Sequence, residues 1–126
     1  MRKVNIGSSR FTEVFCTDEP GQGGANHEYI VAYAENIKIS GDETPPAQVK
    51  FQNGPIKEFG INGCQHEDLL AIVIDRLYSF QAGEFSCREN ELALIKLEEA
   101  MHWLNHRTKD REIQGVEGKN QHRKQI

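Results

Sequence analysis

The sequence has few cysteines and lacks long apolar runs. No apolar stretch approaches the roughly 18 residues of a membrane-spanning helix, and the basic first residues lack the apolar segment of a secretory signal. Cys16, Cys64 and Cys87 lie far apart, and no Cys-x-x-Cys pair occurs. We therefore expect a cytoplasmic protein that has no membrane span, disulfide framework or zinc site and whose thiols are buried and reduced.

Signatures of catalysis and of metal binding are also scarce. His102 and His106 are four residues apart but lack the glutamate of an H-E-x-x-H motif, so we expect both on the solvent side of a helix. The GQGGAN segment has the wrong glycine spacing for a dinucleotide-binding loop and is expected to be a hairpin loop. No Ser/His/Asp arrangement or activated cysteine is recognisable. The sequence thus predicts no catalytic residue, no metal and no cofactor.

The charge of the chain is unevenly distributed. Its 126 residues, 37% of them hydrophobic, suit one domain with a net charge of −4. Residues 1–99 hold 9 Lys and Arg against 16 Asp and Glu, which gives −7, whereas residues 100–126 hold 6 against 3, which gives +3. A basic end on an acidic body indicates a small anionic partner and argues against duplex nucleic acid. The alternative, which the charge pattern alone favours, is that these cations only complement the dipole of a helix end.

The first half of the chain predicts strands, because apolar and polar residues alternate between turns rich in glycine and proline. We expect residues 1–63 to be mainly β, with strands over the following segments: Phe11–Cys16, Glu28–Ser40 (one or two strands), Gln48–Gln52 and a last short one over Ile56–Ile61.

The second half predicts helices over residues 64–113, followed by a polar tail over residues 114–126. The first helix is expected over Glu67–Gln81, where apolar residues recur at helical spacing. Ser86 and Glu89 match a capping box, which predicts a second helix from Cys87 to about Arg111. The expected fold is therefore α+β, a single domain over residues 1–126 in which an N-terminal antiparallel sheet precedes two C-terminal helices, the second long and oligomer-forming.

The second predicted helix is apolar over a wide surface, with nine apolar residues among the thirteen from Leu92 to Leu104. One stripe has the spacing of a coiled coil, and further residues widen it: Leu94, Leu97, Met101 and Leu104, then Ala93, Ala100 and Trp103. A helix that covers one small sheet needs a narrower face. Either the sheet wraps around this helix or a second copy packs against it, and we expect an oligomer.

The segment FQAGEFSCREN between the two helices combines aromatic, amide and cationic side chains. Phe80 and Phe85 flank a glycine and lie near Arg88 and Asn90 in sequence. These residue types hold a nucleotide base by stacking and by hydrogen bonds to its edge. The alternative, which composition alone favours, is that both rings belong to the core and that Asn90 is merely exposed.

Over roughly residues 11–119 the chain resembles the first-described family of phage Thoeris anti-defence proteins. The most specific motifs are FQNGPI, FQAG-x-F-x-C-R-E-N and R-T-x-x-R followed by GVEG. The resemblance implies a sponge that binds, without cleaving it, a cyclic ADP-ribose isomer made by bacterial TIR-domain enzymes. It also implies homodimers that assemble to a hexamer, a second site for cyclic trinucleotides in some members, and a sheet followed by helices.

The resemblance implies ligand contacts at Phe80, Asn90, Arg107 and Arg111, with Phe80 stacked on the adenine, Asn90 hydrogen-bonded and the arginines at the diphosphate. Asn90 and Arg107 are 17 residues apart, or about 25 Å along a helix, too far for one nucleotide. Two antiparallel helices that cross near Glu98 would bring Asn90 of one chain beside Arg107 of the other.

Two other functions are alternatives to the sponge. They are an enzyme that hydrolyses a cyclic nucleotide signal and an accessory module that binds nucleic acid or protein.

Overall fold

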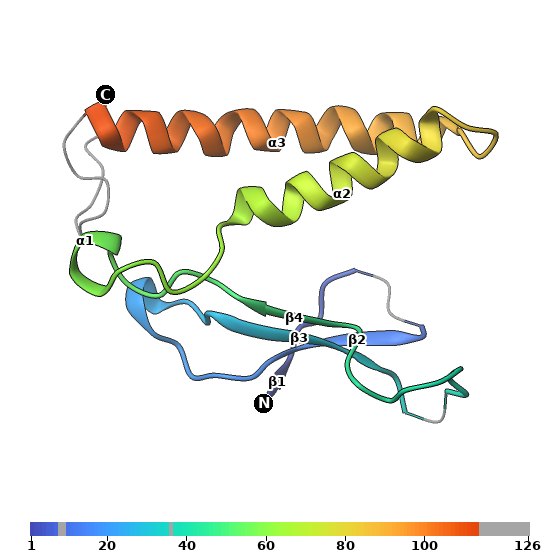
Figure 1. The fold of residues 1–126 in the computed structure, drawn as a ribbon, viewed down its shortest axis with the longest axis horizontal. Helices are drawn as coiled ribbons and strands as arrows, with labels where there is room; N and C mark the ends of the chain where they lie inside the picture. The colour runs from blue at the N-terminus through green and yellow to red at the C-terminus, as the bar shows by residue number, and fades with distance from the viewer. Residues whose placement is uncertain (8–9, 36, 114–126) are drawn as a thin grey trace. The chain divides into compact units, whose positions relative to one another are not determined.

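The computed structural model describes residues 1–7, 10–35 and 37–113, with side chains up to Asp110. The predicted polar tail over residues 114–126 lies outside the described residues. The chain forms two compact units, Met1–Cys64 and Gln65–Ile126 (Figure 1). The predicted α+β fold, with an antiparallel sheet followed by helices of which the last is long, is confirmed. That both units form a single domain stays a prediction.

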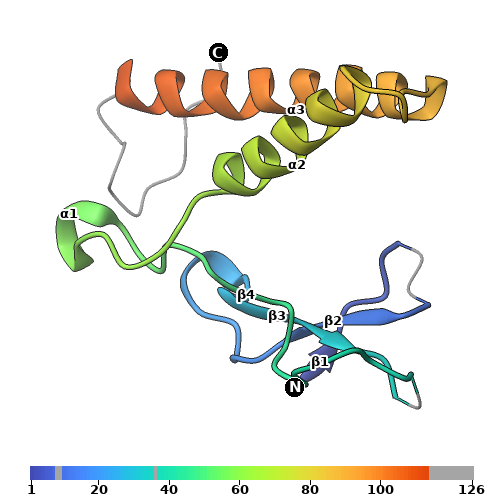
Figure 2. The same cartoon turned by 45° about the vertical axis from the view of Figure 1, so that its right-hand side comes forward.

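The first unit is built on an antiparallel sheet whose four strands follow one another in chain order (Figure 2). The strands are β1 (Arg2–Lys3), β2 (Thr12–Cys16), β3 (Glu28–Tyr33) and β4 (Ala47–Lys50). In the central pair Val14 lies opposite Val31, and Cys16 opposite Tyr29. The strands predicted over Phe11–Cys16, Glu28–Ser40 and Gln48–Gln52 are confirmed, and their ends agree to within two residues except at Ser40. β3 stops well short of Ser40, because β2 begins at Thr12 and leaves no partner strand beyond Tyr33.

The predicted strand over Ile56–Ile61 is wrong, because Ile56–Phe59 forms the short helix α1. Pro55 precedes it with a φ of −62°, which suits a helix start. Gly60 ends it with a φ of +72°, a value that favours glycine. The ring of Phe59 folds back over Gly54, where an added Cβ would lie 2.5 Å from the ring. The predicted strand is therefore overridden by the proline and the glycines around this segment.

The GQGGAN segment lies in the loop between β2 and β3, as predicted, and includes a 3-10 turn over Gln22–Gly24. The carboxylate of Asp18 organises this loop. It accepts hydrogen bonds from the backbone amides of His27 at 3.0 Å and Glu28 at 3.2 Å. The Asn26 side-chain amide also donates to the Asp18 carbonyl at 2.7 Å. One acidic side chain thus holds both the exit from β2 and the entry into β3.

The second unit is a hairpin of two antiparallel helices, α2 (His66–Gln81) and α3 (Arg88–Ile113). The two helices lie side by side in Figures 1 and 2. The predicted helices over Glu67–Gln81 and from Cys87 to about Arg111 are confirmed to within two residues. Buried and half-buried apolar side chains form a stripe on each helix that includes Leu70, Ile74 and Leu77 on α2, and Leu94, Leu97, Met101 and Leu104 on α3. The predicted coiled-coil stripe is therefore the surface on which α3 packs against α2.

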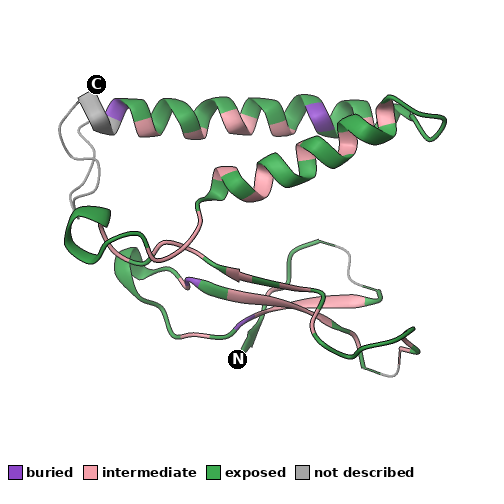
Figure 3. Cartoon of the chain, viewed as in Figure 1, coloured by how far each residue is buried: buried purple, intermediate pink, exposed green. Residues whose placement is uncertain are grey.

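Few side chains are fully buried (Figure 3). Among the described residues, the fully buried apolar side chains are those of Cys16 and Leu94. Cys64 is half-buried and Cys87 is exposed, so the prediction of three buried thiols is right for Cys16 alone. Cys87 is exposed because it lies in the turn between α2 and α3. No helix in the described part of the chain is both long enough and apolar enough to cross a membrane.

The hairpin leaves large apolar side chains exposed on the face of α3 that points away from α2. Leu92, Ile95 and Trp103 are exposed there, Trp103 by 59%. Most of the stability of a short helix comes from packing its apolar face. Within residues 65–110 the one fully buried apolar side chain is that of Leu94, so little apolar burial stabilises the described part of the two helices.

We expect the loop between β2 and β3 to loosen in acid. Partial desolvation by itself raises the pKa of Asp18, but hydrogen bonds from the amides of His27 and Glu28 outweigh this effect and hold the pKa below its ordinary value of 3.8. A carboxyl whose pKa is lower in the folded than in the unfolded chain adds stability above the unfolded pKa, and this stability is lost as the pH falls through the folded pKa.

Asp18→Asn should therefore speed amide-proton exchange of His27 and Glu28 at neutral pH by roughly tenfold or more, as measured by NMR. In acid, the exchange rates of these two amides in the wild type should approach the rates in Asp18→Asn. Asp42→Asn is the control, because Asp42 holds a different loop through Thr44 and should leave these two amides unchanged. Equal exchange in Asp18→Asn and the wild type at neutral pH would contradict the assignment.

Candidate ligand-binding site

The turn between α2 and α3 is closed by the side chain of Gln81. Its Nε2 donates to the Cys87 carbonyl at 3.0 Å, and its Oε1 accepts from the Cys87 backbone amide at 2.9 Å. One primary amide thus satisfies both backbone groups of a single residue, as a neighbouring strand would. This pair of bonds determines where α3 begins relative to the end of α2.

The N-terminus of α3 differs from the prediction by one residue. The Asn90 backbone amide donates to Sγ of Cys87 at 3.4 Å, so Cys87 occupies the N-cap position. The predicted capping box of Ser86 with Glu89 is wrong. The physical reason is that Gln81 already holds both backbone groups of Cys87 and places this residue at the helix start. Asn90 consequently lies in the first turn of α3.

Both aromatic rings of this region are accessible. Phe80 is 37% exposed and Phe85 is 71% exposed, whereas Asn90 is half-buried. The guanidinium carbon of Arg76 lies 5.1 Å from the centre of the Phe80 ring. Within the helical unit neither ring belongs to a core, and the alternative of two core rings with an exposed Asn90 does not hold there.

Phe80 and Asn90 both lie at the turn end of the hairpin, Phe80 in the last turn of α2 and Asn90 in the first turn of α3. Successive helical residues turn by about 100°, which places Phe80 on one side of the α2 stripe and Tyr78 on the other. On α3 the same geometry places Asn90 in line with the packing stripe and Glu98 to one side of it. Tyr78 donates a hydrogen bond to Glu98, which identifies the second flank. The Phe80 flank and the Tyr78 flank are therefore separate surfaces.

The two arginines predicted to bind the ligand lie far along α3 from the turn between α2 and α3. Arg107 is exposed, and the side chain of Arg111 lies outside the described residues. Asn90 and Arg107 belong to one continuous helix, so their separation is about 25 Å. The structure brings Phe80 and Asn90 to the turn and leaves Arg107 near the other end of α3. One chain does not bring the four predicted residues together.

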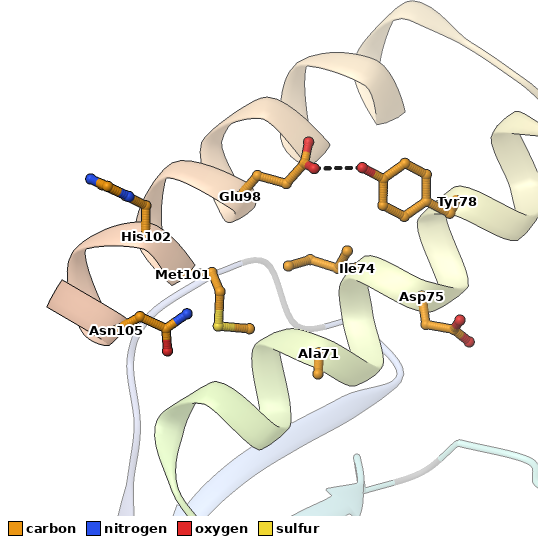
Figure 4. Close-up of a pocket in the computed structure, with 8 residues that line it drawn as sticks. All are labelled: Ala71, Ile74, Asp75, Tyr78, Glu98, Met101, His102 and Asn105. Atoms are coloured by element: carbon orange, nitrogen blue, oxygen red, sulfur yellow. Dashed lines mark hydrogen bonds between the residues drawn. The ribbon is translucent and has the colours of Figure 1, made fainter. Parts of the chain in front are cut away.

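The Tyr78 flank carries a groove that sequence reasoning missed (Figure 4). It has a volume of about 510 Å³ and is lined by Ala71, Ile74, Asp75, Tyr78, Glu98, Met101, His102 and Asn105. The hydrogen bond to Glu98 raises the pKa of Tyr78, with desolvation and the negative charge of Glu98 adding to the effect. No local motif signals this groove, because its two walls come from residues twenty or more positions apart.

The histidine pair on α3 is exposed, as predicted. The rings of His102 and His106 are stacked with centres 6.5 Å apart, and Trp103 lies edge-on to both. Within residues 1–7, 10–35 and 37–110, no three His, Cys, Asp or Glu side chains are grouped so that they could hold a metal ion.

The fold and the site define a class, namely a small α+β protein whose helical hairpin presents an aromatic ring and an amide at its turn and an arginine near the far end. Residues 45–109 match the family described as Acb2/Tad1, hairpin domain, which is more than half of the chain. The chain belongs to this family, and the resemblance seen in the sequence is confirmed. Phe80, Asn90 and Arg107 lie inside the matched range, and Arg111 lies just beyond it.

One relative is named Thoeris anti-defense 1 and comes from Bacillus phage SBSphiJ7. It is 60% identical over 72 residues, which are 57% of this chain and 51% of the relative. The chain therefore spans about half the length of the curated relative that it matches.

We expect Gln81→Glu to loosen the turn in a pH-dependent manner. A carboxylate accepts from the Cys87 amide but cannot donate to its carbonyl, and it would lie beside Glu91, whose carboxylate is 3.4 Å from Gln81 Nε2. Protonation restores the donor. Amide exchange of Cys87, measured by NMR, should be faster than in the wild type at neutral pH and similar to it near pH 4.

Gln81→Met is the matched control, because methionine has a similar length and donates no hydrogen bond at any pH. In this variant, amide exchange of Cys87 should be faster than in the wild type both at neutral pH and near pH 4. If all three proteins exchange Cys87 at one rate, the Gln81 side chain does not hold the turn.

Proposed function

We propose that this protein is a phage anti-defence sponge that binds and sequesters, without cleaving it, a cyclic ADP-ribose isomer made by bacterial TIR-domain enzymes in the host cytosol. The observation that carries the proposal is the accessible Phe80 ring at the turn end of a hairpin that belongs to the Acb2/Tad1 family, with Asn90 in the first turn of the second helix. The name of the phage relative, Thoeris anti-defense 1, supports the anti-defence role.

The binding residues have complementary chemistry. Phe80 offers a π-face on which an adenine stacks, and Asn90 offers a donor and an acceptor for the base edge. Arg107 and Arg111 are one helical turn apart on α3 and form a pair suited to a diphosphate. None of these four groups is a nucleophile or a general base at neutral pH, because arginine stays protonated and an amide does not titrate. The site therefore favours holding a nucleotide over breaking it.

Each site is completed by a second chain. One α3 helix separates Asn90 from Arg107 by about 25 Å, so a nucleotide bound at Phe80 needs arginines from elsewhere. Two α3 helices that pack antiparallel and cross near Glu98 and Glu99 supply them, and two-fold symmetry then makes two equal sites. Such homodimers assemble further to a hexamer in this proposal.

The flank that carries Phe80 also carries surface for this packing. Ala93, Ala100 and Arg107 recur every seven residues on α3 and so share one side of the helix. Small side chains allow two helices to approach closely, and the few buried residues of the hairpin leave it in need of apolar cover. The dimer contact and the nucleotide site then lie on the same flank.

We expect the reaction product of a purified TIR-domain enzyme to disappear from solution when it is mixed with the protein and to return unmodified after heat denaturation. Native mass spectrometry of the mixture reads the oligomeric state, the ligand mass and the stoichiometry together. Phe80→Ala should weaken binding by about 1–3 kcal/mol, the contribution of one base stack. Tyr78→Phe, on the opposite flank, should bind as the wild type does.

Two other results would replace this proposal. Recovery of cleaved products would favour an enzyme that hydrolyses a cyclic nucleotide signal. Salt-dependent binding of DNA or RNA would favour a nucleic-acid module, against which the charge of −7 over residues 1–99 speaks. Added binding of cyclic oligonucleotides that does not compete with the first ligand would reveal a second site.

Complementation tests the shared site directly. One variant loses the base end, Phe80→Ala with Asn90→Ala, and the other loses the arginine end, Arg107→Ala with Arg111→Ala. Neither should bind by itself, although both should keep the oligomeric state of the wild type. When the two variants are co-expressed, half of the dimers are mixed and one of their two sites is intact, so about a quarter of the wild-type capacity should return.

Calorimetric titration of the co-expressed protein measures this capacity. A site formed within one chain would regain nothing on mixing, and this outcome would reject the shared site. Loss of the oligomer in the arginine-end variant would assign Arg107 and Arg111 to assembly instead of binding.

A further inference from the structure

The Phe80 ring is not free on both faces. Arg76 lies one helical turn earlier on α2, and its guanidinium carbon is 5.1 Å from the ring centre. This is the geometry of a cation–π contact, in which a planar guanidinium covers an aromatic face. The ring is nevertheless 37% exposed. One face of Phe80 is thus occupied by a residue of its own helix, while other parts of the ring remain open to solvent.

A covered face has two consequences for a stacking residue. An incoming base can stack on the opposite face, so the approach of the ligand has a defined direction. The contact also restricts the rotation of the side chain, and a side chain that is ordered before binding loses less conformational freedom on binding. Both effects act through Phe80 and require no contact between Arg76 and the ligand.

We propose that Arg76 is a positioning residue for nucleotide binding, which holds the Phe80 ring by covering one face and directs the base of the ligand to the other face. This inference rests on the proposed function, because it assumes that Phe80 stacks on a base. The ligand class is a purine nucleotide, and Arg76 and Phe80 come from the same chain, whatever the second chain contributes.

A matched pair elsewhere in the chain provides the control. The guanidinium carbon of Arg10 lies 5.3 Å from the centre of the Phe11 ring, in the sheet unit. The two pairs share residue types and spacing to within 0.2 Å. Arg10→Ala therefore removes the same charge and the same kind of contact away from the site, and it should leave nucleotide binding unchanged.

A double-mutant cycle separates an effect through Phe80 from a direct contact. The four proteins are the wild type, Arg76→Ala, Phe80→Leu and the double variant, with the TIR-enzyme product as the probe in calorimetric titration. Leucine keeps apolar volume at position 80 but removes the π-face. Arg76→Ala should lower the affinity roughly two- to fivefold in the wild type, the range expected for an exposed cation–π contact. It should have no effect when position 80 is leucine.

Rescue and NMR add independent readouts. Arg76→Lys keeps a cation and should recover part of the affinity, whereas Arg76→Gln should not. In the ligand-free wild type, the side-chain protons of Arg76 should be shifted upfield by the ring, and this shift should vanish in Phe80→Leu. The NMR measurement tests the pair without any ligand.

The outcomes distinguish this inference from the proposed function. If the wild type fails to bind the TIR-enzyme product, the proposed function falls and the role of Arg76 falls with it. If the wild type binds and Arg76→Ala binds equally well, the role of Arg76 alone is overturned. If Arg76→Ala lowers the affinity by the same factor in the wild type and in Phe80→Leu, the role is also overturned. Arg76 would then act on the ligand without Phe80, through a direct contact.

Discussion

The rigid length of α3 is the constraint on which the rest of this protein depends. A helix rises by about 1.5 Å per residue, and no choice of rotamer brings Asn90 and Arg107 of one chain to the same nucleotide. If both residues serve one site, that site requires two chains. In the proposed dimer, binding and assembly are then one problem, because a surface that joined two α3 helices would also place an arginine of one chain beside the turn of the other.

The turn between α2 and α3 is the second determinant, because it positions the candidate base-binding residues. Gln81 pairs with both backbone groups of Cys87 and so makes Cys87 the N-cap of α3. Asn90 then lies in the first helical turn, while Tyr78 and Glu98 close one flank of the hairpin. The hairpin thus has two chemically distinct sides, one with an arginine-backed aromatic ring and one with a groove beside Tyr78 and Glu98.

Most of the secondary structure could be predicted from the sequence, because local periodicity determines it. The alternation in Phe11–Cys16 and the helical spacing in Glu67–Gln81 both identified elements that the structure contains. The prediction failed over Ile56–Ile61, where Pro55 and Gly60 outweigh alternation. It failed again at Ser86, where a tertiary contact from Gln81 decides which residue caps the helix. Such a contact leaves no periodic signal in the sequence.

The sequence by itself determined the family, the residue types of the candidate site and the distance between them along one helix, because motif, composition and helical rise are local properties. Only the tertiary structure decided that Arg76 covers the Phe80 ring and that Tyr78 meets Glu98. These features depend on side-chain direction and on the register of two packed helices. That register is set by contacts between residues far apart in the sequence, such as Tyr78 and Glu98, which are twenty positions apart.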